Sequence, residues 1–269
     1  MIDIIGINQS QSKTSIYPIH SELHSEKIGL DTLKSKIFDR VLDIIIHSNN
    51  SGIFVMDRGF DDKKVIQELY KHNASFIIRM KKNRHVFYKG DLLNISKVAD
   101  QISKRHKFEI DHKRTIRAGI SEISIPLSRH KVKDPEKAKV YLVSAEITSK
   151  KSNDRNFTGK FMILISMPGS KKSSKEMCEL ALKSYRLRWK IEEVHRQIKT
   201  DFGWEKMQLL KFDRLQALNT LLWLALGFIY ELDDWKYKFA KAFTSLILDK
   251  KNDLKILNQF HLLSNNKSY

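Results

Sequence analysis

The segment from Tyr185 to Lys199 constrains the fold of this chain most, because it contains no Gly or Pro and its apolar residues recur at helical spacing. At about 100° per residue, one arc of roughly 60° holds the apolar side chains Leu180, Leu187, Ile191, Val194 and Ile198. The opposite arc, also about 60° wide, holds Tyr185, Arg188, Glu192 and Lys199, flanked by Trp189 and Arg196. The pattern predicts one helix that buries its apolar arc and presents a carboxylate among cations and aromatic rings.

The polar arc of this helix has two interpretations. In the first it is a solvated face, on which Glu192 forms i,i+4 ion pairs with Arg188 and Arg196. In the second Glu192 is a metal ligand among phosphate-binding groups, since Arg and Lys neutralise phosphates, Tyr donates a hydrogen bond and Trp offers a stacking plane. Two aromatic residues within a basic stripe favour the second interpretation, because solvation alone does not account for them.

Two sequence motifs resemble those of one enzyme family. Tyr185, Arg188, Glu192 and Lys199 stand at the offsets of the Tyr-Arg-Glu-Lys signature of insertion-sequence DDE transposases of the IS-four type. Upstream, the run from Asp57 to Phe60 reads Asp-Arg-Gly-Phe and resembles the Asp-Arg-Gly-aromatic motif of the same family. Standing alone, an Asp before a Gly after a strand is often only a turn former or a helix cap. The long separation between Asp57 and Glu192 suits a family with a β-rich insertion before its last catalytic helix.

The resemblance implies a specific chemistry. It implies an RNase H-like fold in which three carboxylates, Asp, Asp and Glu, hold Mg²⁺, for which Mn²⁺ substitutes, and Asp57 and Glu192 fill the second and third places. Two such ions about 3.5–4 Å apart activate a water and stabilise the leaving oxygen. Tyr185, Arg188 and Lys199 would bind the transposon end, and Trp189 would stack on or separate its terminal bases. Paired transposon ends imply a homodimer on DNA.

The first carboxylate is not evident in the sequence. Asp3 lies near the start of an expected strand, but its separation from Asp57 is short for the family. The segment 2–23 instead resembles the strands that follow the first catalytic Asp. We therefore expect an N-terminally truncated transposase. The rival hypothesis is a compact variant in which Asp3 is the first ligand.

Charge and composition indicate the partner and the compartment. The chain has 49 Lys and Arg against 31 Asp and Glu, a net charge of +18, which indicates a polyanionic partner, most simply DNA.

The single Cys178 excludes an intrachain disulfide, suits a reducing compartment and is expected to be a buried, inert thiol. No signal peptide is evident, and the apolar segment 215–232 is interpreted as a buried helix rather than a membrane span. We expect a cytoplasmic, nucleoid-associated protein without a membrane partner.

The order of the expected elements predicts an α/β fold. Segments 2–7 and 14–23 read as a hairpin, in which Pro18 indicates an edge position or a bend. A helix is expected over 31–47, followed by a strand at 53–56, a helix at 61–72 and a strand at 74–80. This β-α-β order predicts an RNase H-like mixed sheet with flanking helices, and Asp57 stands at the carboxyl end of a strand, where ligands gather.

Over residues 86–168 the expected elements are short strands separated by basic loops. Strands are expected at 120–127, 139–148 and 161–167, separated by basic loops at 104–107, 112–117, 129–133 and 150–155. The predicted domains are a core at 1–85, a β-rich insertion at 86–168, a catalytic helix and second core part at 169–235, and a basic tail at 236–269.

Further DNA-backbone contacts are expected from Arg58, Lys81, Lys82 and Arg84. Two other function classes stay open: an RNase H-like nuclease without strand transfer, and a DNA-binding remnant or inhibitor without catalysis.

Overall fold

The computed structural model describes residues 2–9, 13–23, 52–109, 114–127, 137–149, 159–207 and 211–264, together with Asp39 and Asp43, which are helical. The rest of the helix expected over 31–47, and the basic loops at 129–133 and 150–155, lie outside the described residues. The chain divides into two compact units, one formed by Met1–His24 with His195–Tyr269 and the other by Ser25–Val194.

The unit Ser25–Val194 is built on one mixed sheet. Its strands are β3 (Ile53–Met56), β4 (Ser75–Arg79), β5 (His85–Tyr88), β6 (Asp91–Asn94), β7 (His106–Glu109), β8 (Arg114–Pro126), β9 (Lys137–Ser149) and β10 (Lys160–Ser166). Their order is β3-β4-β10-β9-β8-β5-β6, and β7 pairs with β8. β3 and β4 are parallel, as the β-α-β pattern predicts, and the other pairs are antiparallel.

The segment predicted as a β-rich insertion is not a separate layer. Its last strand, β10, pairs with β4, so the expected strands at 120–127, 139–148 and 161–167 join the sheet that carries β3. The loop expected at 112–117 is shorter than predicted, because β8 already begins at Arg114. The domain boundaries themselves stay a prediction.

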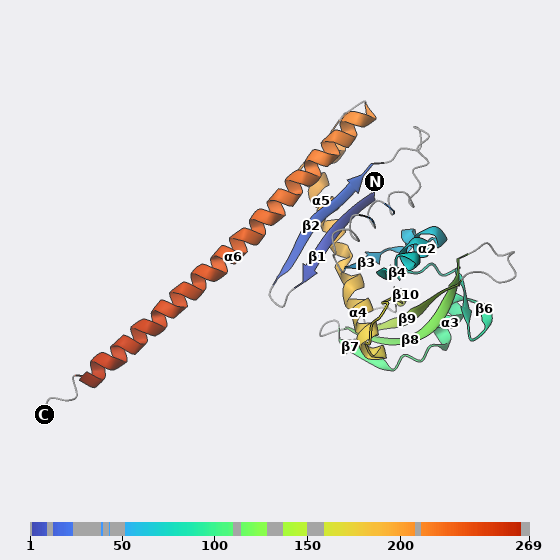
Figure 1. Cartoon of the computed structure of the whole chain (residues 1–269), viewed down its shortest axis with the longest axis horizontal. Coiled ribbons are helices and arrows are strands. Elements are labelled where there is room, and N and C mark those ends of the chain that lie inside the picture. Colours follow the sequence, from blue (N-terminus) through green and yellow to red (C-terminus); the bar gives the residue numbers. More distant parts are fainter. Residues whose placement is uncertain are drawn as a thin grey trace. The chain divides into compact units, whose positions relative to one another are not determined.

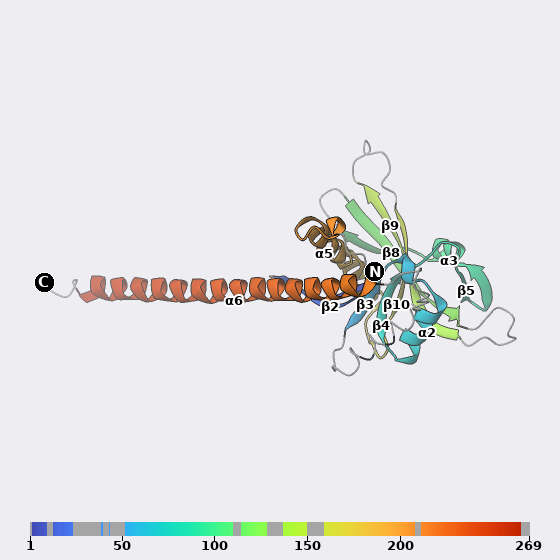
Figure 2. The same cartoon turned by 90° about the horizontal axis from the view of Figure 1, so that it is seen from above.

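Helices cover both faces of this sheet. α2 (Lys63–Lys71) and α3 (Ile95–Gln101) pack on one face, as Figure 2 shows, and α4 (Ser174–Leu187) packs on the other. Side chains alternate accordingly along β4: Phe76 and Ile78 join the core under α2 and α3, whereas Ile77 joins the core under α4. Both faces are therefore buried, which is why these strands read as continuous apolar runs.

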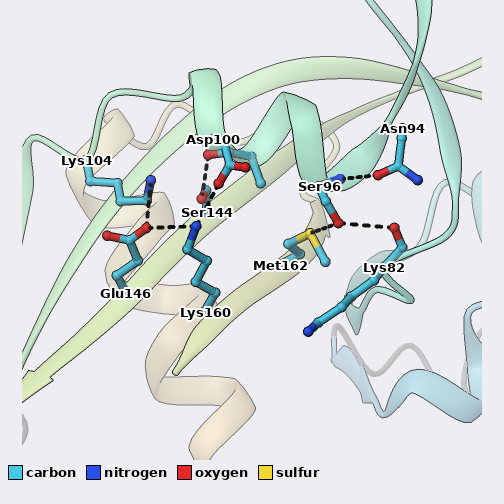
Figure 3. A network of polar contacts seen from close by, with 10 residues as sticks. Lys82, Asn94, Ser96, Asp100, Lys104, Ser144, Glu146, Lys160 and Met162 are labelled. Carbon is cyan, nitrogen blue, oxygen red and sulfur yellow. Dashed lines mark hydrogen bonds and ion pairs between the residues drawn. The ribbon is translucent and has the colours of Figure 1, made fainter. Parts of the chain in front are cut away.

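Polar contacts hold α3 to the sheet and fix the turn before β5 (Figure 3). The Ser144 hydroxyl donates to the Ala99 carbonyl at 2.9 Å in a buried position. The Ser96 hydroxyl donates to the Lys82 carbonyl at 3.1 Å, so α3 anchors the turn that carries Lys82. The ion pair of Lys160 with Asp100 at 2.9 Å is largely exposed, and such surface pairs contribute about 0–1 kcal/mol.

Cys178 lies on α4 within the second core. It is fully buried, and desolvation raises the pKa of its thiol to about 11. The thiol is therefore protonated at neutral pH, which agrees with the expected inert thiol.

The other unit combines a hairpin with a long helix. β1 (Ile2–Gln9) and β2 (Thr14–Glu22) are antiparallel, and their register shifts between Ile4 and Ile5, where Pro18 faces Ile5. The predicted hairpin and its bend at Pro18 are thus confirmed. α6 (Phe212–Ser264) runs along β2 (Figure 1). The Lys13 ammonium donates to Asp234 at 2.7 Å and fixes the hairpin turn to α6.

The interpretation of segment 215–232 as a buried helix holds for one face only. Leu222, Trp223 and Leu226 are buried, but Leu221, Leu224 and Phe228 are 62–66% exposed. The sequence does not separate the two faces because both are apolar. By length and composition, Phe212–Lys236 is also long and apolar enough to cross a membrane, a test that many core helices of soluble proteins pass.

Candidate active site

Asp57 stands where the carboxyl ends of two parallel strands meet. Met56 pairs in register with Ile78, so Asp57 and Arg79 occupy the next positions at this edge of the sheet. Asp57 is exposed, and its Oδ1 accepts the Gly59 N–H at 2.7 Å, capping a short 3-10 helix at Arg58–Phe60. A Cβ at position 59 would lie 2.9 Å from that oxygen, which accounts for Gly in the motif. The capping role is therefore real, and it uses one oxygen of the carboxylate.

The predicted single helix from Tyr185 to Lys199 is in fact two helices, α4 and α5 (Trp189–Thr200). The Arg188 N–H donates to the Tyr185 carbonyl and the Ile191 N–H to the Arg188 carbonyl, both at 3.2 Å and both spanning three residues. Such bonds tighten the turn and interrupt the α-helical ladder. Tyr185 thus lies in the last turn of α4, whereas Glu192 lies in the first turn of α5.

Arg79 stacks between two aromatic rings at the end of β4. Its guanidinium carbon lies 4.9 Å from the ring centre of Phe161 and 5.9 Å from that of Tyr185. Its Nη1 also donates to the Tyr185 hydroxyl at 3.5 Å. Arg79 is not among the predicted site residues, although its place at the end of the strand next to β3 was a usable signal. The structure therefore adds a cation to the predicted site.

Arg188 pairs with Glu192 and lies against the ring of Tyr185. Its Nη2 donates to Glu192 Oε1, and its guanidinium lies 5.9 Å from the ring centre of Tyr185. Burial lowers the pKa of Arg188, but the hydrogen bond to Glu192 and the charges of Tyr185, Glu192 and Asp57 outweigh it and raise the pKa. Arg79 and Arg188 both lie against the Tyr185 ring, and Arg79 is level with Asp57, so two motifs that are far apart in the sequence lie at the same edge of the sheet.

The remaining predicted DNA contacts fall into two groups. Arg58, Lys82 and Trp189 are exposed, and the Lys190 ammonium lies 4.2 Å from the Trp189 ring centre. Three cations contact other groups of the protein. Lys199 pairs with Glu205 at 2.7 Å, the Lys81 ammonium donates to the Asp61 carbonyl at 3.3 Å, and Arg84 forms an ion pair with the buried Asp61. All of these DNA contacts stay predictions.

A model of the transposase DDE domain family matches residues 31–228, well over half of the chain. The chain belongs to the DDE transposase domain family. The mixed sheet with flanking helices is accordingly the RNase H-like fold of these transposases, as predicted. A comparison with curated proteins found no match to the chain. The segment that holds Asp3 lies outside the matched residues.

The hypothesis of a compact variant requires Asp3 to bind a metal ion, but its carboxylate contacts other side chains. The Asp3 side chain is 1% exposed, and its Oδ2 lies 2.6 Å from His195 Nε2. Its Oδ1 accepts the Ser21 hydroxyl at 2.6 Å, and Ser21 in turn accepts from the Asn219 amide at 2.7 Å. Both carboxylate oxygens are therefore engaged, which argues against Asp3 as the first metal ligand. His195, which had no evident partner in the sequence, joins α5 to β1.

The donor chemistry of Asp57 and Glu192 fits a divalent cation. Neither Asp57 Oδ2 nor Glu192 Oε2 accepts a hydrogen bond from any residue that the structure describes. Both carboxylates are exposed, and hard cations such as Mg²⁺ prefer carboxylate oxygens and water. Within the described ranges no group of three His, Cys, Asp or Glu side chains is placed to hold a metal ion. Asp57 and Glu192 thus stay the predicted ligands, and the described residues offer no third carboxylate beside them.

Proposed function

We propose that this chain is an insertion-sequence transposase of the IS-four type, which cleaves DNA strands at transposon ends and joins them to target DNA with divalent metal ions. The observation that carries the proposal is a set of contacts at the carboxyl edge of the sheet. Arg79, which is level with Asp57, lies against the Tyr185 ring. Arg188 lies against the same ring and donates to Glu192. The family match supports a DNA-acting enzyme. We further propose that it acts on DNA in the cytoplasm, where it associates with the nucleoid.

Each residue of the site has a definite task in this proposal. Asp57 and Glu192 would hold Mg²⁺ or Mn²⁺, and such ions, when bound, activate the attacking water and stabilise the leaving oxygen. Arg79 and Arg188, which both lie against the Tyr185 ring, would bind phosphate oxygens. Trp189, which is 47% exposed, would stack on a terminal base. Lys199, Arg58, Lys81 and Lys82 would neutralise flanking phosphates.

A basic recess next to α4 supports binding of a longer stretch of DNA. The recess has a volume of about 460 Å³, and apolar side chains form part of its lining. Its charged lining residues are Lys107, Lys175, Lys183, Arg186, Glu109 and Glu179. Of its four cations only Lys183 has an ion-pair partner among the described residues, Glu179 at 2.6 Å. Lys175 and Arg186 are separated by about 16 Å along α4, a distance that covers several phosphates of one strand.

Replacing Lys107, Lys175 and Arg186 together by Gln should weaken DNA binding and flatten its salt dependence. Each phosphate contact contributes about 0.9 to the slope of log K against log salt, so the slope should fall by about 3. Fluorescence anisotropy with a labelled duplex at several salt concentrations measures this. The matched control replaces Lys89, Lys97 and Lys139, which lie elsewhere on the surface of the same unit. Equal slopes for the two triple variants would show that the recess makes no special contact.

A strand-joining assay separates the three candidate functions. It uses a pre-cleaved transposon end with a free 3′ hydroxyl, a target plasmid and Mg²⁺ or Mn²⁺. A transposase joins the end to the plasmid. A nuclease nicks the plasmid without joining, and a DNA-binding remnant does neither while still binding the end. The last alternative is favoured by one observation, the lack of a third carboxylate beside Asp57 and Glu192 among the described residues.

A further inference from the structure

A series of side-chain hydrogen bonds within one unit connects α6, through the hairpin, to α5. The Asn219 amide of α6 donates to the Ser21 hydroxyl at 2.7 Å, and Ser21 donates to Asp3 Oδ1 at 2.6 Å. Asp3 Oδ2 lies 2.6 Å from His195 Nε2, and since a carboxylate only accepts, the imidazole is the donor. We name these four residues the α5 anchor.

The α5 anchor is a buried polar network in which both oxygens of Asp3 have a donor. The Asp3 side chain and Asn219 are each 1% exposed, and Asp3 faces Ser21 directly in the register of the hairpin. A buried charge pair adds little stability compared with apolar side chains of similar volume. Setting the geometry of α5 therefore explains the network better than stability does.

A second polar contact holds α5 from another side. The Tyr230 hydroxyl of α6 donates to Gln197 Oε1 at 2.7 Å. At about 100° per residue, His195 and Gln197 leave the helix about 200° apart. The buried side chains Val194 and Ile198 also hold α5, but apolar contacts are non-directional, whereas hydrogen bonds require a narrow range of distance and angle. The two polar contacts thus fix the rotation of α5 about its axis.

We propose that the Asp3–His195 pair positions Lys199, an inference that rests on the proposed function, in which Lys199 binds a phosphate. Lys199 follows His195 by four residues, so its side chain leaves α5 about 40° away and about 6 Å further along the axis. A rotation of α5 by about 20° moves a group at the helix surface, about 6 Å from the axis, by about 2 Å. A displacement of that size breaks a hydrogen-bonded contact with a phosphate oxygen.

Lys199 can exchange its present partner for a phosphate. Its ammonium pairs with Glu205 at 2.7 Å, and the two side chains are 53% and 65% exposed. Exposed pairs of this kind are weak, so Glu205 does not determine where the ammonium lies when DNA is bound. The orientation of α5 determines which positions the ammonium can reach, and the α5 anchor fixes that orientation.

The test is a double-variant cycle on DNA binding, carried out in EDTA so that no metal-dependent step takes part. Fluorescence anisotropy with a labelled duplex at several salt concentrations gives the slope of log K against log salt. Lys199→Gln should reduce the magnitude of this slope by about 0.9, the contribution of one phosphate contact. His195→Leu should reduce it equally, and the two changes together should reduce it no further.

Lys206→Gln is the matched control for this cycle. Lys206 is an exposed cation of the same unit, but it lies outside α5. Any effect of Lys206→Gln on the slope should therefore add to the effect of His195→Leu, whereas the effect of Lys199→Gln should not.

Two further variants separate positioning from stability. His195→Gln keeps an N–H donor for Asp3 and should restore the wild-type slope. Asp3→Val together with His195→Leu removes both polar partners, so this variant should be more stable to urea than His195→Leu alone, while its slope stays about 0.9 smaller than that of the wild type. A slope that recovers together with stability would overturn the proposal and assign the pair a purely structural role.

The remaining outcomes distinguish this proposal from the proposed function. If Lys199→Gln reduces the slope and His195→Leu does not, the positioning role is wrong and the phosphate contact of Lys199 stands. If Lys199→Gln leaves the slope unchanged, Lys199 binds no phosphate and both ideas fail. A chain that shows the expected slopes but joins no DNA strand contradicts the proposed function and leaves the positioning role intact.

Discussion

Replacing Glu192 by Gln should abolish metal-dependent nicking of supercoiled DNA, with a loss of at least about a thousandfold. Gln keeps the hydrogen bond from Arg188 but removes the charge that would hold a divalent cation. A metal ion contributes several kcal/mol to stabilising the transition state, and a loss of that size lowers the rate by several powers of ten. The fraction of plasmid converted to the open-circular form with time measures the effect.

Glu193→Gln is the matched control for this result. Glu193 is the next residue on α5 and loses the same charge, but its carboxylate pairs with Lys190 at 2.8 Å and is not one of the predicted metal ligands. Its nicking rate should stay within about twofold of the wild type. Nicking by Glu192→Gln at the wild-type rate would remove Glu192 from the catalytic set, and the activity would then belong to another group or another nuclease.

Replacing Arg84 by Ala should destabilise the unit that carries the site by about 3–5 kcal/mol, because it leaves a buried carboxylate without its cation. The Asp61 side chain is fully buried and that of Arg84 is 11% exposed. Asp61 Oδ1 and Arg84 Nε have no hydrogen-bond partner other than their ion pair among the described residues. Asp61 Oδ2 accepts the Lys81 N–H at 2.7 Å, so the pair also fixes the turn after β4. Urea unfolding followed by circular dichroism measures the change.

Two further variants serve as comparisons for Arg84→Ala. Lys82→Ala, at an exposed position of the same turn, should change stability by less than about 0.5 kcal/mol. The double variant Asp61→Asn with Arg84→Met removes both charges and should be less destabilised than Arg84→Ala alone. If Arg84→Ala unfolds like the wild type and instead loses DNA affinity, Arg84 acts as the sequence suggested, as a phosphate contact rather than as a structural cation.

Local patterns in the sequence predicted the elements that position Asp57. The apolar runs at 53–56 and 74–80 with a helix between them specify a parallel pair, and the structure contains β3, α2 and β4 in that arrangement. The hairpin and its bend at Pro18 follow from equally local signals. These elements were predictable because each depends on periodicity and turn residues within a few positions.

The break between α4 and α5 was not predictable from spacing. Arg188 keeps helical dihedral angles, φ −53° and ψ −33°, and no Gly or Pro marks the change to three-residue hydrogen bonds. The apolar arc therefore continues across the break, with Val194 and Ile198 buried as expected. Only the polar arc is affected, since Tyr185 and Glu192 lie on different helices.

Contacts between residues far apart in the chain could not be predicted from the sequence for a different reason. Asp3 and His195 are far apart in the chain, and no local pattern connects an Asp on a strand with a His on a helix. Arg79 differs from them, because its place at the end of the strand adjacent to β3 was available from the predicted topology. The exposed apolar face of α6 was missed because a segment that is apolar on both faces reads as a buried helix.

The most direct test of the site is Mn²⁺ binding measured by electron paramagnetic resonance, in which bound Mn²⁺ loses the sharp signal of the free ion. The wild type should bind Mn²⁺, and Asp57→Asn and Glu192→Gln should each weaken binding at least about tenfold, since each removes a carboxylate ligand. Glu193→Gln should bind like the wild type. Equal Mn²⁺ binding by all four proteins would contradict a metal site shared by Asp57 and Glu192.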